Sequence, residues 1–125
     1  MSALPRGWPD EVPPPDAPEW QRRAVGWLLD QCPGDFRSYD VLRRHPTVLA
    51  RFAAEHVAAC RAAIRDGLAG ARPDLRHLPP DVLDDVVAAY ETEAARLARL
   101  AQAVDLVGRA LGGQRFVARL DDDAR

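Results

Sequence analysis

Two side chains that could do chemistry, His56 and Cys60, are four residues apart in the segment EHVAAC. Four residues make about one turn of an α-helix, so the imidazole and the thiol point in the same direction. Such a pair suits half of a metal site, a catalytic dyad or two residues of a core. A structural metal site needs further ligands, and His45 and His77 are too distant along the chain to supply them. We predict that both side chains are buried and structural, with no metal bound.

An alternative interpretation adds Tyr90 and Glu93, which lie in the next long helical segment. With His56 and Cys60 they would line a pocket for a small ligand or a metal ion. The chain has no glycine-rich phosphate loop, and no serine or threonine has a recognisable histidine and acid around it. We therefore assign no catalytic residue and no cofactor, and the sequence favours a protein that is not an enzyme.

A stripe of arginines occupies one face of the segment that contains His56 when residues are placed 100° apart around a helix. Its members are Arg51, Arg61, Arg65 and Arg72. The stripe could bind an acidic protein partner or RNA phosphates, or it could be a solvated face, because Glu55 and Asp66 lie beside it. The formal net charge of −2 gives no overall attraction to nucleic acid or to an anionic membrane. Nucleic-acid binding is not expected.

Periodicity and end signals predict the helices that must position these residues. They span about 16–31, 38–45, 46–70 and 80–111, with Asp16 and Ser38 as N-caps and Gly112 and Gly113 as the final stop. Six of the 11 prolines fall in the first 18 residues, which predicts an extended arm. Trp8 would either anchor this arm to the body, which we favour, or reach a partner. The fold class is all-α. We expect a proline-rich arm (1–15), one helical domain (16–113) and a short tail (114–125).

The two long helices are expected to form an antiparallel hairpin, because a seven-residue apolar repeat runs along segment 80–111. A connector of about ten residues then places residue 56 near residue 96 and residue 47 near residue 105. In that register Asp105 should pair with His45 or the Thr47 backbone. His56 should form one hydrogen bond to a neighbouring helix.

The last third of segment 80–111 is apolar on nearly every side, so something must cover it. One possibility is an intramolecular cover from the segment before residue 46, and the other is a homodimer. The cover would consist of Trp27, Phe36, Tyr39 and Leu42, and the dimer would form through Leu100, Leu106 and Val107.

The run WLLDQCPGDFRSYDVLRRHPTVLARFAAEHV (27–57) resembles small all-α proteins of actinobacteria whose function is unknown. The resemblance implies a bacterial origin and assigns no functional residue.

These observations lead to a small helical bundle that acts as a non-catalytic interaction or accessory module. The alternatives are a small-ligand or metal binder around His56 and Cys60, and an RNA-associated protein that uses the arginine stripe. The first 15 residues lack the apolar segment of a signal peptide, and no apolar run is long enough for a membrane span. We therefore expect a cytoplasmic protein with reduced cysteines.

Overall fold

The computed structural model describes residues 4–116 and is all-α over that range, as predicted. Four α-helices and one 3₁₀ helix follow one another: α1 (Trp20–Asp30), η1 (Gly34–Ser38), α2 (Asp40–Arg44), α3 (Pro46–Asp74) and α4 (Pro80–Leu111). None of the helices in the described range combines the length and apolarity that crossing a membrane requires.

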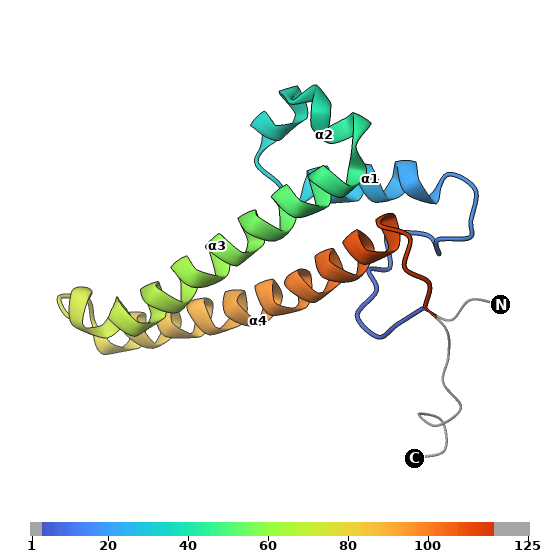
Figure 1. Ribbon diagram of the computed structural model, residues 1–125. Helices are drawn as coiled ribbons and strands as arrows, with labels where there is room; N and C mark the ends of the chain where they lie inside the picture. Colours follow the sequence, from blue (N-terminus) through green and yellow to red (C-terminus); the bar gives the residue numbers. More distant parts are fainter. Residues whose placement is uncertain (1–3, 117–125) are drawn as a thin grey trace, which may run out of the picture.

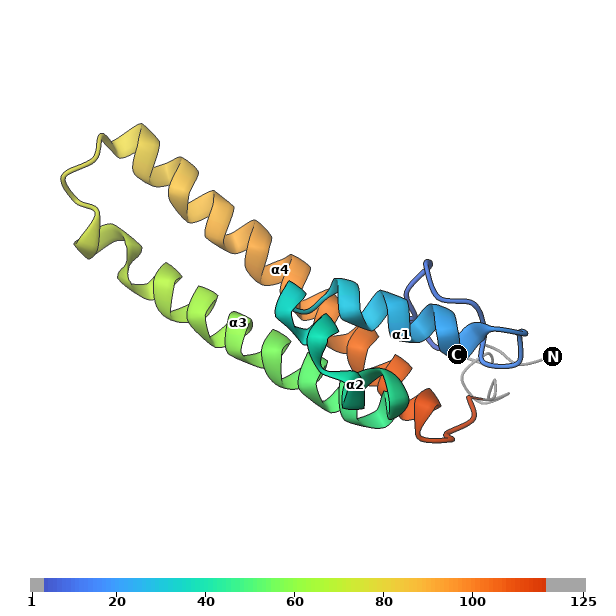
Figure 2. The ribbon, with the colours of Figure 1, turned by 90° about the horizontal axis from the view of Figure 1, so that it is seen from above.

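Helices α3 and α4 lie side by side as a long antiparallel hairpin (Figures 1 and 2). Three contacts fix their register: Arg72 pairs with Asp84 at 3.1 Å, Gly67 faces the Tyr90 ring, and Gly108 faces Ala50. This register is displaced from the expected one by about one to one and a half helical turns. The reason is that α3 continues through Pro73 to Asp74, so the connector is only residues 75–79.

The beginning of α1 also differs from the prediction. Asp16 is not its N-cap, because tight turns closed by Ala17 N–H to Pro14 O and by Trp20 N–H to Ala17 O occupy the expected first turn. Glu19, directly before the helix, has a left-handed backbone with φ of 66°. A left-handed residue cannot continue a right-handed helix, so α1 starts at Trp20.

Ser38 likewise does not cap the next helix. Its hydroxyl donates to the Asp35 carbonyl at 2.7 Å within η1, and α2 starts two residues later at Asp40. Helix α4 has the expected bounds, and its end is closed at Gly113, whose N–H donates to the Ala110 carbonyl. The positive φ of Gly113, 97°, turns the chain so that the next N–H, of Gln114, reaches the Arg109 carbonyl.

The N-terminal arm is a series of tight turns rather than one extended segment. The backbone N–H of Trp8 donates to the Pro5 carbonyl, and the backbone N–H of Val12 donates to the Pro9 carbonyl. The Trp8 indole is buried and donates to the Val12 carbonyl at 2.8 Å. The arm therefore docks on the helical body with Trp8 as its anchor.

The core lies at the end of the hairpin where the arm, α1 and α2 pack against α3 and α4 (Figure 1). It is a single cluster of buried apolar side chains. Its members include Trp8, Val12, Ala24, Leu28, Leu29, Leu42, Leu49, Ala53, Val57, Val104, Leu106, Val107 and Ala110.

This core provides intramolecular cover for the last third of α4. Leu106 and Val107 are only 6% and 0% exposed, so a dimer through them would require the core to open. The cover differs in part from the expected one. Trp8 and Val12 join Leu42, and Trp27 and Phe36 pack against this cluster as partly buried side chains, whereas Tyr39 is 49% exposed.

A groove on the uncovered half of the hairpin

Helix α1 covers only one half of the hairpin, and the other half projects as two helices without a third layer (Figures 1 and 2). This distal half comprises residues 60–74 of α3 and 80–95 of α4. Only Ala71 and Leu83 are buried there, and the larger side chains Leu68 and Val87 are half-buried. Two helices alone cannot surround their apolar residues, so part of this surface stays in contact with water.

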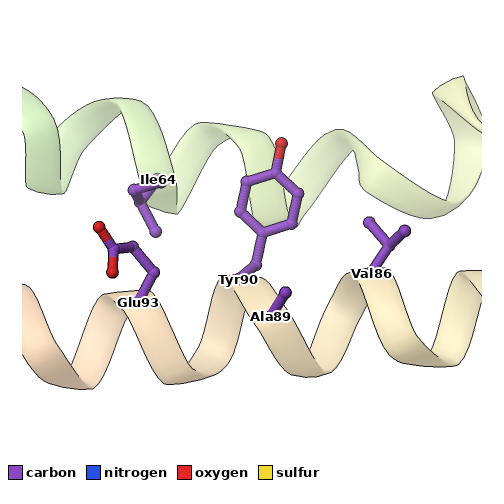
Figure 3. A pocket seen from close by; sticks show the side chains of 5 residues that line it. All are labelled: Ile64, Val86, Ala89, Tyr90 and Glu93. Carbon is purple, nitrogen blue, oxygen red and sulfur yellow. The ribbon is translucent and has the colours of Figure 1, made fainter.

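A shallow groove of about 270 Å³ runs along one side of the distal half, and its lining is almost wholly apolar. Figure 3 shows its walls, which are formed by Ile64 from α3 and by Val86, Ala89, Tyr90 and Glu93 from α4. We call it the distal groove. It exists because Gly67 has no side chain, so the Tyr90 ring can lie directly on α3. A Cβ atom at Gly67 would be 2.5 Å from the Tyr90 ring.

The polar rim of the distal groove is an ion pair within α4. Arg96 donates from Nε and Nη2 to the two carboxylate oxygens of Glu93, both at 2.7 Å. These hydrogen bonds lower the pKa of Glu93 and raise the pKa of Arg96, and the charges of the two groups act in the same directions. Both groups remain charged at neutral pH.

The predicted pocket residues fall into two neighbouring pairs. Tyr90 and Glu93 line the distal groove, whereas His56 and Cys60 do not. They lie next to it, because Cys60 is one helical turn before Ile64 of the groove wall. His56 Nε2 is 3.6 Å from Cys60 Sγ. Among residues 4–116 no three histidine, cysteine, aspartate or glutamate side chains converge in a way that could hold a metal ion.

The prediction that His56 and Cys60 are buried is wrong, because both side chains are half-buried. The hydrogen-bond partner of His56 is Cys60 of the same helix rather than a group on α1 or α4. His56 is at the edge of the apolar face of α3, beside the Phe36 ring of η1 at 6.2 Å.

The prediction that Asp105 pairs with His45 or the Thr47 backbone is also wrong. Asp105 is exposed and pairs with Arg109 one turn further along α4, at 3.4 Å. The shift in hairpin register explains the difference, because it moves Asp105 away from the start of α3.

The arginine stripe is exposed along α3 but is not a continuous array of free cations. Arg72 pairs with Asp84 of α4 at 3.1 Å, and Arg51 is 4.0 Å from Glu55. Arg61 and Arg65 have no ion-pair partner within the described part of the chain. The acids between these arginines give the face a mixed charge, as a solvated surface has.

Sequence reasoning missed a surface cluster of aromatic rings at the junction of η1 and α3. Phe36 is its centre, with ring centroids 5.7 Å from Phe52 and 6.0 Å from Tyr39. Phe52 is 36% exposed, although Leu49, three residues before it on α3, is fully buried. From Phe52 the four-residue steps through His56 and Cys60 to Ile64 turn about 120° around α3, so this aromatic cluster and the distal groove lie on adjoining sides of the helix.

Comparison with protein-family models, with curated proteins and with solved structures finds no match to this chain. Any function must therefore be inferred from the surface of the molecule itself.

Proposed function

We propose that this protein is a non-catalytic interaction module that binds a helical protein partner along the distal groove. The observation that carries this proposal is an apolar groove on a half of the hairpin that lacks a third layer. Helix α1 packs against both α3 and α4 on the other half of the hairpin, so the same two helices already contact a third helix there. A partner helix would extend that third layer.

The shape and chemistry of the distal groove suit a helix. Ala89 is a small residue in its wall, and such a residue allows a second helix to approach closely. Val86 and Ile64 offer apolar contacts, while Glu93 and Arg96 form a charged rim. The groove is open along one side, whereas a small ligand or a metal ion needs enclosure and converging polar groups. We also propose a cytoplasmic location, consistent with Cys32 and Cys60 being free thiols.

The test is site-specific photo-crosslinking in living cells. The photoreactive amino acid p-benzoylphenylalanine replaces Ala89 in the groove wall or, as the matched control, Ala98. Both alanines are exposed on α4, and nine residues of helix place them on opposite sides.

We expect a crosslinked protein product from position 89 and none from position 98. An excess of unlabelled wild-type protein should suppress the product, and an excess of the Ala89→Glu variant should not. Equal crosslinking from both positions, or none from position 89, would contradict the proposed function.

A further inference from the structure

One face of α4 along the distal groove carries a charge pattern that is complementary to itself. Successive steps of three or four residues place its members on one stripe, beginning with acids, continuing with small residues and ending with bases. The members are Asp81, Asp85, Ala89, Thr92, Arg96 and Arg99. We call this set the α4 stripe. Its central member Ala89 is in the groove wall, so the stripe and the groove belong to one surface.

The α4 stripe is nearly symmetric about the point midway between Ala89 and Thr92. Asp85 is four residues before Ala89, and Arg96 is four residues after Thr92. If a second α4 crosses antiparallel at that point, Asp85 of each copy lies opposite Arg96 of the other. The same two-fold axis brings Asp81 of one copy near Arg99 of the other. The small residues at the crossing point allow the helices to approach closely.

The charges of the α4 stripe are available for such contacts. Asp81, Asp85 and Arg99 are exposed, and none of them has an ion pair within the described residues. Arg96 uses Nε and Nη2 to bind Glu93 in its own helix, which leaves Nη1 for a second carboxylate. Two contacts of each kind would form, because a two-fold interface repeats every pair.

Apolar surface next to the α4 stripe would be buried in the same contact. Val82 is 39% exposed, and Val86, Ile64 and Tyr90 are only half-buried. The stripe from residue 81 to residue 99 is roughly 27 Å long, and a hairpin is about 20 Å wide, which gives about 500 Å² on each copy. That area is near the lower limit for a specific interface, so we expect a dimer that dissociates on dilution.

From this symmetry we infer that the partner of the distal groove is a second copy of this chain. Two hairpins pack antiparallel through their distal halves and form a four-helix bundle. This inference rests on the proposed function, because it names the ligand of the same surface. Acids early and bases late in a helix also stabilise the helix dipole, so the test must separate that local effect from contact between copies.

The test measures self-association of the purified chain by sedimentation velocity, at two concentrations an order of magnitude apart. We expect wild-type protein to shift from monomer toward dimer as the concentration rises. Asp85→Arg and Arg96→Glu each place like charges opposite one another, and each should weaken dimerisation about tenfold or more. Glu91→Arg, a charge reversal about 120° or more around the helix from Asp85 and Arg96, is the matched control and should leave dimerisation unchanged. Circular dichroism checks that every variant retains its helix content.

The decisive measurement is a mixture of the Asp85→Arg and Arg96→Glu variants. In the mixture each new arginine faces a new glutamate and each remaining aspartate faces a remaining arginine, so a heterodimer should form at concentrations where each variant alone dimerises less than the wild type. A change that acted only through the helix dipole could not be rescued by mixing.

Wild-type protein that stays monomeric at both concentrations, or a mixture that fails to associate, would overturn the homodimer. Crosslinking from position 89 to a different protein would then still support the proposed interaction module. The two proposals therefore fail separately.

Discussion

Cys32 and Cys60 are both half-buried thiols, but their surroundings give them different chemistry. Burial raises the pKa of Cys32, an effect that the nearby charge of Arg37 only partly offsets. Cys60 Sγ instead lies 3.6 Å from the polar Nε2 atom of His56. We predict that iodoacetamide alkylates Cys60 several-fold faster than Cys32 at pH 7. Mass spectrometry of peptides from a time course measures both rates in one sample.

The His56→Gln variant provides the control for this prediction. Glutamine lacks the basic ring nitrogen, so alkylation of Cys60 should slow while that of Cys32 stays the same. Faster reaction at Cys32, or no effect of the substitution, would show that the contact between His56 and Cys60 does not activate the thiol.

Glu93 allows a prediction on pH, because its hydrogen bonds from Arg96 lower its pKa below the ordinary value of 4.5. A carboxyl group whose pKa is lowered by folding stabilises the folded state at any pH above its unfolded-state pKa. That contribution is lost as the pH falls through the lowered pKa. NMR titration should give Glu93 a midpoint below 4.5, and Arg96→Gln should raise it. A midpoint that does not respond to Arg96→Gln would mean that the pair does not persist in solution.

At the scale of the helices, Gly67 is where α3 and α4 depend most on the absence of a side chain. Alanine there gains about 1 kcal/mol of helix propensity, but its Cβ would be 2.5 Å from the Tyr90 ring, and overpacking costs about 1–3 kcal/mol. We predict that Gly67→Ala destabilises the fold by about 1 kcal/mol in urea denaturation. In a Tyr90→Ala background the same change should be stabilising.

Gly26 in α1 is the matched control for Gly67, because a Cβ there would have no neighbour within 4 Å. Gly26→Ala should therefore stabilise the protein by about 0.5–1 kcal/mol through helix propensity alone. If Gly67→Ala behaved like Gly26→Ala in the wild-type background, the close contact with Tyr90 would be absent.

The ends of the helices were predicted well where a single proline or glycine sets them, and less well where packing against another helix sets them. Pro80 and Gly112 bracket α4 in sequence and in structure. Segment 46–70 was expected to end at Gly70, but α3 continues to Asp74, and Gly67 within it serves the contact with Tyr90. That extension changed the hairpin register.

Tyr90 and Glu93 could be named as site residues from sequence, because they lie near the α3 face of α4. Neither the distal groove nor the exposed aromatic cluster could be foreseen. The groove depends on how far α1 reaches along the hairpin, and the cluster depends on how η1 turns its rings. Both are properties of the packed molecule rather than of any segment.

At the scale of the whole molecule, the arm is part of the core rather than an accessory to it. Trp8 is 9% exposed, and its indole bonds the Val12 carbonyl. We predict that Trp8→Ala lowers the free energy of unfolding by about 3 kcal/mol, the cost expected for deleting a buried tryptophan side chain. Urea denaturation monitored by circular dichroism measures it.

Leu4 is the control for Trp8, because it lies in the same arm and is 40% exposed. Leu4→Ala should change stability by less than about 0.5 kcal/mol. Equal effects of the two substitutions would contradict the docked arm.

The docked arm also has a consequence for the order in which the chain is made. The side chain of Gln102 bonds the backbone of Arg6, although 96 residues separate them. A ribosome synthesises the arm long before it synthesises the part of α4 against which the arm packs. Until that part of α4 emerges, Trp8 and the apolar side of α1 have no complete surface to bury against. The nascent chain must therefore carry Trp8 exposed while the residues between the arm and the end of α4 are made, and the core closes only after residue 110 is available.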